Sequence, residues 1–140
     1  MGKTVLYCIV SEQKRPDLSI PTEKKSLHEL YKRIVQLYAN THIAIHCSNG
    51  IGRTGTVALI IYMIDVIKSK SSFDPIKCLA KIREHRCKTV QTSSQFVFAL
   101  SILYEHFKDQ IDRMDKKAYE NFMSLAGEIC NINGKNILKG

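Results

Sequence analysis

Cys47, Arg53 and three nearby glycines form a pattern that suits chemistry on an anion. Arg53 follows Cys47 by six residues, and the glycines occupy positions 50, 52 and 55. Glycines let a backbone curl tightly around an anion, and the N–H groups at a helix start add positive potential there. These amides and the Thr54 hydroxyl would stabilise a thiolate, while Arg53 can donate two parallel hydrogen bonds to phosphate oxygens. We therefore expect a cysteine nucleophile beside a phosphate-binding loop.

Residues 50–55 also match the glycine pattern of a dinucleotide-binding loop. That fold needs a second strand after the helix, with an acidic residue at its end. Asp74 lies 24 residues after Gly50, but Pro75 and another predicted helix follow it directly. The pattern therefore does not indicate a dinucleotide site.

Residues 46–55, His-Cys-Ser-Asn-Gly-Ile-Gly-Arg-Thr-Gly, fit the signature HCx5R[ST]G at every fixed position. In this the sequence resembles the cysteine-dependent protein tyrosine phosphatases. The resemblance implies that Cys47 forms a cysteinyl-phosphate, that Arg53 binds the phosphate, and that His46 and Thr54 support the site. It also implies that neither a metal nor a cofactor takes part. The remaining phosphate-binding residues that it implies are Ser48, Asn49, Gly50, Ile51 and Gly52.

Two flanking segments extend the resemblance. Residues 15–21, Arg-Pro-Asp-Leu-Ser-Ile-Pro, are similar to the family's mobile WPDxGVP loop, which makes Asp17 the general acid. Residues 91–95, Gln-Thr-Ser-Ser-Gln, match the QTxxQ segment of the tyrosine-specific branch. The resemblance gives Gln91 and Gln95 the task of orienting the water that hydrolyses the intermediate. Arg83 and Arg86 also fit the family pattern, and we expect them to serve packing and surface charge.

The sequence departs from the family in the general-acid loop. Arg15 stands where the family has Trp, and Ser19 replaces the usual Gly. These changes leave three enzymatic or binding functions open. The chain is a tyrosine phosphatase, either fully active or weakened by truncation, or a catalytically impaired phosphotyrosine-binding module, or an RNA 5′-phosphatase. The QTxxQ segment argues against RNA, and a fragment that does not fold alone also stays open.

The elements that must position these residues follow from periodicity and turn signals. Residues 3–10 and 43–45 read as strands and 11–21 as a loop, and helices are expected at 22–38, 54–68, 75–86, 93–112 and 119–129. Ser93 or Ser94 is the expected N-cap of the fourth of these helices. This order predicts an α/β fold, a small central sheet packed by helices. The resemblance makes it a truncated version of the tyrosine phosphatase fold.

Length and composition agree with a single domain. The chain has 140 residues and a net charge of +8, which favours anionic partners. We expect one truncated catalytic domain over residues 1–140, with its motifs in 15–96 and a loose tail from about residue 130.

The five cysteines are odd in number and include no CxxC pair, which favours reduced cytoplasm over a disulfide framework. The longest apolar run, residues 57–64, is too short to span a membrane. The expected partners are phosphotyrosine-containing proteins in signalling, and neither a membrane nor nucleic acid.

Overall fold

The computed structural model of the protein describes residues 29–32, 34, 36, 43–69 and 72–137, with side chains as far as Ile129. This part contains the helices α2 (Gly52–Lys68), α3 (Pro75–His85), α4 (Ser93–His106) and α5 (Lys108–Ile137). Residues 29–32, 34 and 36 are also helical, within the helix predicted at 22–38. The strand predicted at 3–10 and the loop predicted at 11–21, with Asp17, lie outside the described residues.

Side chains cap the N-termini of α3 and α4. The Asp74 carboxylate accepts hydrogen bonds from the backbone N–H groups of Ile76 and Lys77, and Pro75 occupies the first helical position. The Thr92 hydroxyl accepts from the N–H of Gln95 over 3.2 Å, so the cap expected at Ser93 or Ser94 lies at Thr92 instead. Such caps satisfy N–H groups that have no partner within the helix.

α2 begins differently. Its N-cap residue, Ile51, offers no side-chain hydrogen bond, and its first turn carries no acidic residue. The N–H groups and the positive end of the helix dipole are therefore available to an anion held by the preceding loop. Residues 47–51, which begin with Cys47, directly precede this end of the helix.

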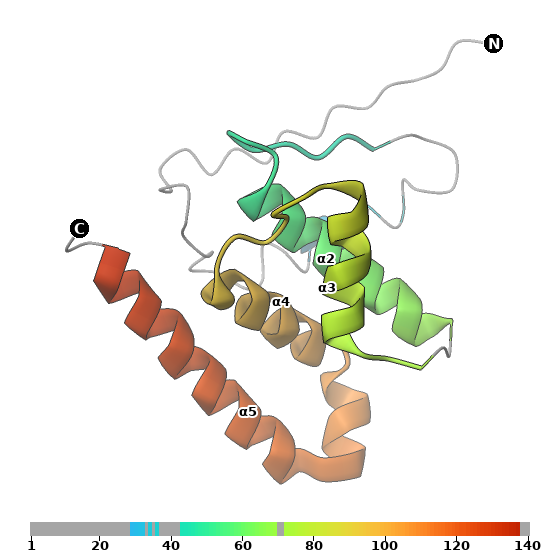
Figure 1. Cartoon of the computed structure of the whole chain (residues 1–140). Coiled ribbons are helices and arrows are strands. Elements are labelled where there is room, and N and C mark those ends of the chain that lie inside the picture. The colour runs from blue at the N-terminus through green and yellow to red at the C-terminus, as the bar shows by residue number, and fades with distance from the viewer. Residues whose placement is uncertain (1–28, 33, 35, 37–42, 70–71, 138–140) are drawn as a thin grey trace.

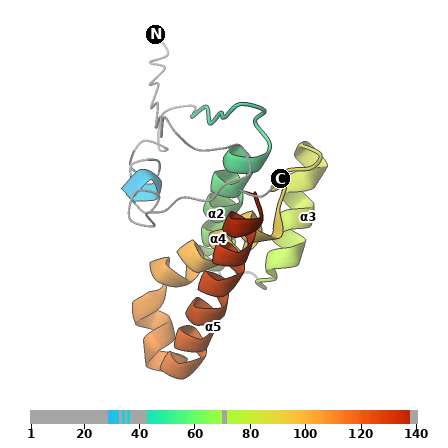
Figure 2. The same ribbon diagram turned by 90° about the vertical axis from the view of Figure 1, so that its left-hand side faces the viewer.

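Apolar side chains of α2 and α4 form the centre of the core. α2 packs against both α3 and α4, and α5 packs against α4 (Figures 1 and 2). Leu59, Met63 and Ile64 of α2 are essentially inaccessible to solvent, as are Phe98 and Ile102 of α4. The strongly apolar run predicted as a helix at 54–68 thus places apolar side chains of α2 against two neighbouring helices. The packed helices fix the direction of the loop that enters α2.

α5 bends at Asp115, which has the non-helical backbone angles φ −158° and ψ 87°. The Asp115 carboxylate accepts a hydrogen bond from the N–H of Ala118 over 2.9 Å and so caps the second half of the helix. After the bend the chain turns back along α4 (Figure 1). The helix predicted at 93–112 therefore ends early, at His106, and the one predicted at 119–129 belongs to the longer α5.

The predicted α/β class, with a small central sheet, is wrong for the described part of the chain. No strand occurs there, and residues 43–47, which include the strand predicted at 43–45, have no regular structure. A strand needs a neighbour to pair its backbone N–H and C=O groups. Ile43 and Ile45 are half-buried and Ala44 is exposed, so this segment has apolar burial but no described partner strand. The described architecture is helical.

Candidate active site

The loop of residues 47–51 leads directly into α2. Gly50 has φ +64°, in the left-handed region that residues with a side chain adopt at a cost. A Cβ atom at Gly50 would lie 3.1 Å from a guanidinium nitrogen of Arg86, so space is also limited there. Conformation and space both require glycine at this turn. The turn aims the N–H groups around Gly50 and Ile51 at the sulfur of Cys47.

The Cys47 thiol is tuned towards the thiolate. Partial burial raises its pKa, but hydrogen bonds from the Thr54 hydroxyl and from backbone N–H groups lower it more. The contributing N–H groups belong to Thr54, Ile51 and Gly50, and the pKa falls from 9.0 to about 7. Thr54 Oγ1 is buried, and its proton stabilises the Cys47 thiolate. A large fraction of Cys47 is therefore an anionic nucleophile near neutral pH.

Arg53 reaches back across the loop. One of its terminal guanidinium nitrogens donates a hydrogen bond to Ser48 Oγ over 2.9 Å. This contact brings a positive charge from the first turn of α2 to the start of the loop that carries Cys47. A guanidinium in this position can pair with two oxygens of a tetrahedral anion held by the loop amides.

A second segment, residues 86–92, packs against the Cys47 loop and is named here the glutamine segment. Arg86 donates from its guanidinium to the backbone oxygen of Asn49 over 3.0 Å. The backbone N–H of Val90 donates to the carbonyl oxygen of Ile51 over 3.2 Å. These two bonds fix the glutamine segment against both the loop and the start of α2.

The two predicted glutamines meet at Gly52. A Cβ atom at Gly52 would collide with Gln91 Oε1 and would lie 2.9 Å from Gln95 Nε2, so both side chains lie over this glycine. Gln95 is 1% exposed, and its Oε1 accepts a hydrogen bond from the backbone N–H of Gln91 over 2.8 Å. Gln95 Nε2 is buried and has no partner among the described residues. Gln95 thus holds the backbone of Gln91, and Gln91 itself is exposed to solvent.

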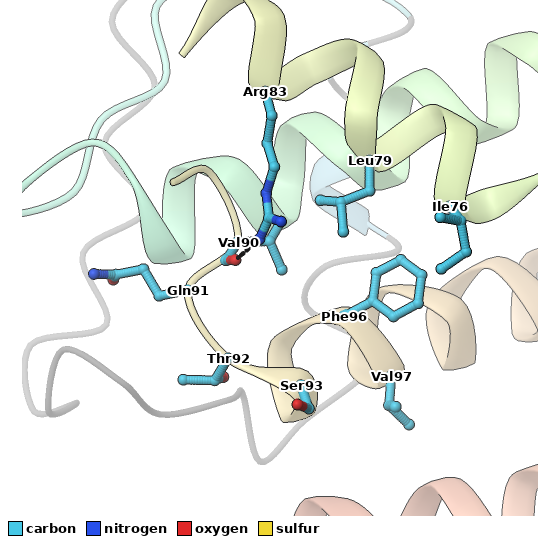
Figure 3. Close-up of a pocket in the computed structure, with 9 residues that line it drawn as sticks. All are labelled: Ile76, Leu79, Arg83, Val90, Gln91, Thr92, Ser93, Phe96 and Val97. Atoms are coloured by element: carbon cyan, nitrogen blue, oxygen red, sulfur yellow. Dashed lines mark hydrogen bonds between the residues drawn. The ribbon is translucent and has the colours of Figure 1, made fainter. Parts of the chain in front are cut away.

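Val90 is the buried one of two residues in the glutamine segment that have a positive φ. It is 2% exposed and has φ +60°, a conformation that is uncommon and costly for a β-branched residue. Such a conformation costs on the order of 1–3 kcal/mol and persists only where the surroundings enforce it. Here the surroundings include Arg83 of α3, which donates to the carbonyl oxygen of Val90 over 2.8 Å (Figure 3). Arg83 and Gln91 also line one pocket of about 290 Å³ between α3, the glutamine segment and α4.

The structure brings together most of the residues that the sequence nominates. Cys47 and Arg53 share one loop with the phosphate-binding candidates, and Gln91 and Gln95 lie beside it. His46 is exposed. Asp17 lies outside the described residues, so its role as general acid stays a prediction. The sequence interpretation gave Arg83 and Arg86 only packing and surface charge. Their spacing of three, which places both on one side of a helix end, was the available signal of a shared role.

Comparison with known proteins agrees with this geometry. The family model described as protein-tyrosine phosphatase matches residues 12–105. Receptor-type tyrosine-protein phosphatase alpha of Mus musculus is 36% identical over 95 residues, which are 66% of this chain and 11% of the relative. Receptor-type tyrosine-protein phosphatase epsilon of Rattus norvegicus is 30% identical over 110 residues, 77% of this chain and 16% of the relative.

A shorter relative, a protein-tyrosine-phosphatase of Arabidopsis thaliana, is 34% identical over 97 residues. The match takes in 67% of this chain and 28% of the relative. The chain therefore spans a small part of the length of the curated relatives that it matches. The matched residues include the Cys47 loop, α2, α3 and the glutamine segment. On the family match and these identities, the chain belongs to the protein-tyrosine phosphatase family.

Proposed function

We propose that this chain is a protein tyrosine phosphatase that hydrolyses phosphotyrosine in proteins through a cysteinyl-phosphate intermediate. One observation carries the proposal: the Cys47 thiol, with a pKa of about 7, lies at the N-terminus of a helix that no side chain caps. Arg53 lies over the same loop. Thiolate, guanidinium and converging amides together suit attack on a phosphate ester.

In the first step the Cys47 sulfur attacks phosphorus in line. The S–P bond forms as the P–O bond to the tyrosine ring breaks, and Asp17 donates its proton to the departing phenolate. Arg53 and the loop amides hold the three non-bridging oxygens, whose charge is spread in a loose transition state. This positive field comes from the chain itself, so the proposal includes no metal and no cofactor.

In the second step a water molecule held by Gln91 and Gln95 attacks the same phosphorus. Asp17 accepts the proton of the water, the P–O bond forms, and the S–P bond breaks with its electron pair returning to Cys47. Inorganic phosphate leaves and Asp17 is protonated again. The pair of glutamines over Gly52, next to the Cys47 loop, supports this assignment.

We propose that residues 1–140 form one partial catalytic domain. Its cytoplasmic location and its role in signalling stay predictions. None of the helices in the described part of the chain combines the length and apolarity needed to cross a bilayer. The curated relatives named above include receptor-type proteins. The proposed substrates are phosphotyrosine-containing proteins.

The test is release of inorganic phosphate from a phosphotyrosine peptide by the full chain, with Cys47→Ser as the matched variant. We expect release by the unsubstituted chain, none by the variant, and retained peptide binding by the variant in calorimetry. Binding without release by the unsubstituted chain would instead support the phosphotyrosine-binding module. Preferential release from the triphosphate end of an RNA would refute the tyrosine assignment.

A further inference from the structure

Arg83 of α3 holds the glutamine segment through two hydrogen bonds to its backbone. Its Nε donates to the carbonyl oxygen of Thr89 over 2.9 Å, and a terminal nitrogen donates to that of Val90 over 2.8 Å. Figure 3 shows the side chain descending from α3 onto the backbone at Val90. One planar group thus binds two successive carbonyl oxygens, which a single point-like donor cannot do.

The two hydrogen bonds from Arg83, called here the Arg83 clamp, hold the part of the backbone that sets the direction of Gln91. Val90 adopts φ +60° while 2% exposed, and Lys88, two residues earlier, has φ +62°. Between them, Thr89 is 4% exposed and its hydroxyl donates to the carbonyl oxygen of Arg86 over 2.5 Å. A segment with two left-handed residues keeps this shape only while outside bonds hold it. Arg83 supplies two of those bonds.

The Cys47 loop has bonds of its own that do not involve Arg83. The carbonyl oxygen of Ile51, which accepts from Val90, also accepts from the N–H of Gly55 over 3.1 Å. Ser48 is held by Arg53. Loss of the Arg83 clamp therefore leaves the Cys47 loop with its bonds within the loop and α2. The backbone that carries Gln91 loses two of its bonds and keeps those from Val90 to Ile51 and from Gln91 to Gln95.

We propose that Arg83 is a positioning residue for the second chemical step, in which water cleaves the cysteinyl-phosphate. This inference rests on the proposed function. Arg83 fixes Val90, Val90 directs Gln91 over Gly52, and Gln91 orients the water whose oxygen bonds to phosphorus as the S–P bond breaks. The first step uses the Cys47 loop and Arg53, and it does not use Gln91. Substitution of Arg83 therefore slows the second step more than the first.

The experiment is a rapid-quench study of the full chain with p-nitrophenyl phosphate in the presence of glycerol. The burst of nitrophenolate reports the first step, and phosphoenzyme together with the ratio of glycerol phosphate to inorganic phosphate reports the second. Arg83→Met should leave the burst rate constant nearly unchanged and lower steady-state turnover about 10- to 100-fold, because misplacing a positioning group has costs of this size. Phosphoenzyme should accumulate, and the ratio should shift towards glycerol phosphate. Arg83→Lys, which keeps the charge but not the fork, should lie between the two.

Arg113→Met is the control for loss of an exposed arginine, since Arg113 donates within α5 to the carbonyl oxygen of Asp109. It should leave burst, turnover and product ratio unchanged. Equal losses in burst and turnover by Arg83→Met, or an unchanged product ratio, would overturn the inference while leaving the proposed function intact. If Arg83→Met does not fold, the same split measured with Arg83→Lys decides. A lack of Cys47-dependent release of inorganic phosphate by the unsubstituted chain would refute the proposed function and this inference with it.

Discussion

The N–H of Val90 donates a hydrogen bond to the carbonyl oxygen of Ile51, the residue that immediately precedes α2. This bond joins residues 39 positions apart in the sequence. Ile51 contributes its own N–H to stabilise the Cys47 thiolate. Ile51 therefore serves two parts of the site. Its N–H faces the Cys47 sulfur, and its carbonyl oxygen accepts a hydrogen bond from the segment that carries Gln91.

The glycines of α2 make this close approach possible. Gly52 leaves room for the Gln91 and Gln95 side chains, and Gly55 leaves room for Thr89 and the backbone nitrogen of Val90. A side chain at Gly52 would displace the two glutamine side chains, and one at Gly55 would push the backbone at Val90 away. The loop signature thus contains two glycines that act through packing and not only through backbone freedom.

Thr54→Val should raise the pKa of Cys47 above its value of about 7, by roughly one unit, because the thiolate loses one hydrogen bond. Alkylation of Cys47 by iodoacetamide follows the thiolate, so its rate should rise through pH 7 in the unsubstituted chain and at higher pH in the variant. Mass spectrometry of the Cys47 peptide separates this reaction from that of the other thiols. Thr54→Ser keeps the hydroxyl and should keep the midpoint.

Thr56→Val is the matched control on the same helix, because the Thr56 hydroxyl donates to the carbonyl oxygen of Gly52 and not to Cys47. An equal shift in both valine variants would contradict the assignment to Thr54. The lowered pKa also links to folding. Thiolate stabilisation is fully present above the unfolded pKa near 9 and is lost as the pH falls through 7. The stability difference between the unsubstituted chain and Cys47→Ser should therefore change across pH 7–9.

Gly55→Ala and Gly127→Ala should have opposite effects on stability. A Cβ atom at Gly55 would collide with Thr89 Cγ2 and lie 2.8 Å from the backbone nitrogen of Val90, whereas one at Gly127 meets nothing within 4 Å. Overpacking of this kind costs about 1–3 kcal/mol. In an open helical position, alanine gains roughly 0.5–1 kcal/mol over glycine. Urea unfolding measures both, and a Gly55→Ala variant as stable as the unsubstituted chain would contradict the packing argument.

How much the sequence predicts depends on how local each signal is. The helices expected at 54–68 and 75–86 agree closely with α2 (Gly52–Lys68) and α3 (Pro75–His85), because apolar periodicity and the Asp74–Pro75 cap are local. The Cys47 loop likewise lies within ten consecutive residues. The central sheet was predicted from short apolar runs, but a sheet depends on partners distant in sequence, and no described segment pairs with residues 43–45.

The same limit applies within the site. The resemblance identifies Gln91 and Gln95 in the sequence. The sequence does not predict the bonds from Arg83 and Arg86 that hold the glutamine segment, which carries Gln91. Nor does it indicate that Val90 adopts φ +60°, since a valine gives no local reason for that conformation. Both features arise when α3 packs beside the start of α2, which only the tertiary structure determines.

Tyr119→Phe should weaken the contact between α4 and α5 by about 1 kcal/mol, the net worth of an ordinary hydrogen bond. The Tyr119 hydroxyl donates to Glu105 Oε2 over 2.8 Å. Burial, and then Glu105, raises the pKa of Tyr119 to about 12. The phenol contributes stability in full below the unfolded pKa of 10, and this contribution is lost as the pH rises towards 12.

Urea unfolding at pH 8, 10 and 11 measures this difference, which should shrink only above about pH 10. Tyr104→Phe is the control, since the Tyr104 ring stacks on Phe122 at 4.2 Å and the substitution keeps the ring. It should change stability by less than about 0.5 kcal/mol at every pH. A Tyr119→Phe difference that stays constant up to pH 11 would be inconsistent with the raised pKa.

Arg53→Lys should weaken binding of a tetrahedral anion by roughly 100-fold, because a lysine keeps the charge but loses the fork that spans two oxygens. The contact from Arg53 to Ser48 Oγ holds the guanidinium over the Cys47 loop, and a shorter, single-point donor cannot reproduce that position. Titration calorimetry with orthovanadate measures the affinity without turnover. Arg113→Lys on α5, where Arg113 bonds to the backbone of Asp109, is the matched control and should bind vanadate as the unsubstituted chain does. If Arg53→Lys binds within about threefold of the unsubstituted chain, the two-oxygen fork of Arg53 does not contribute to holding the anion.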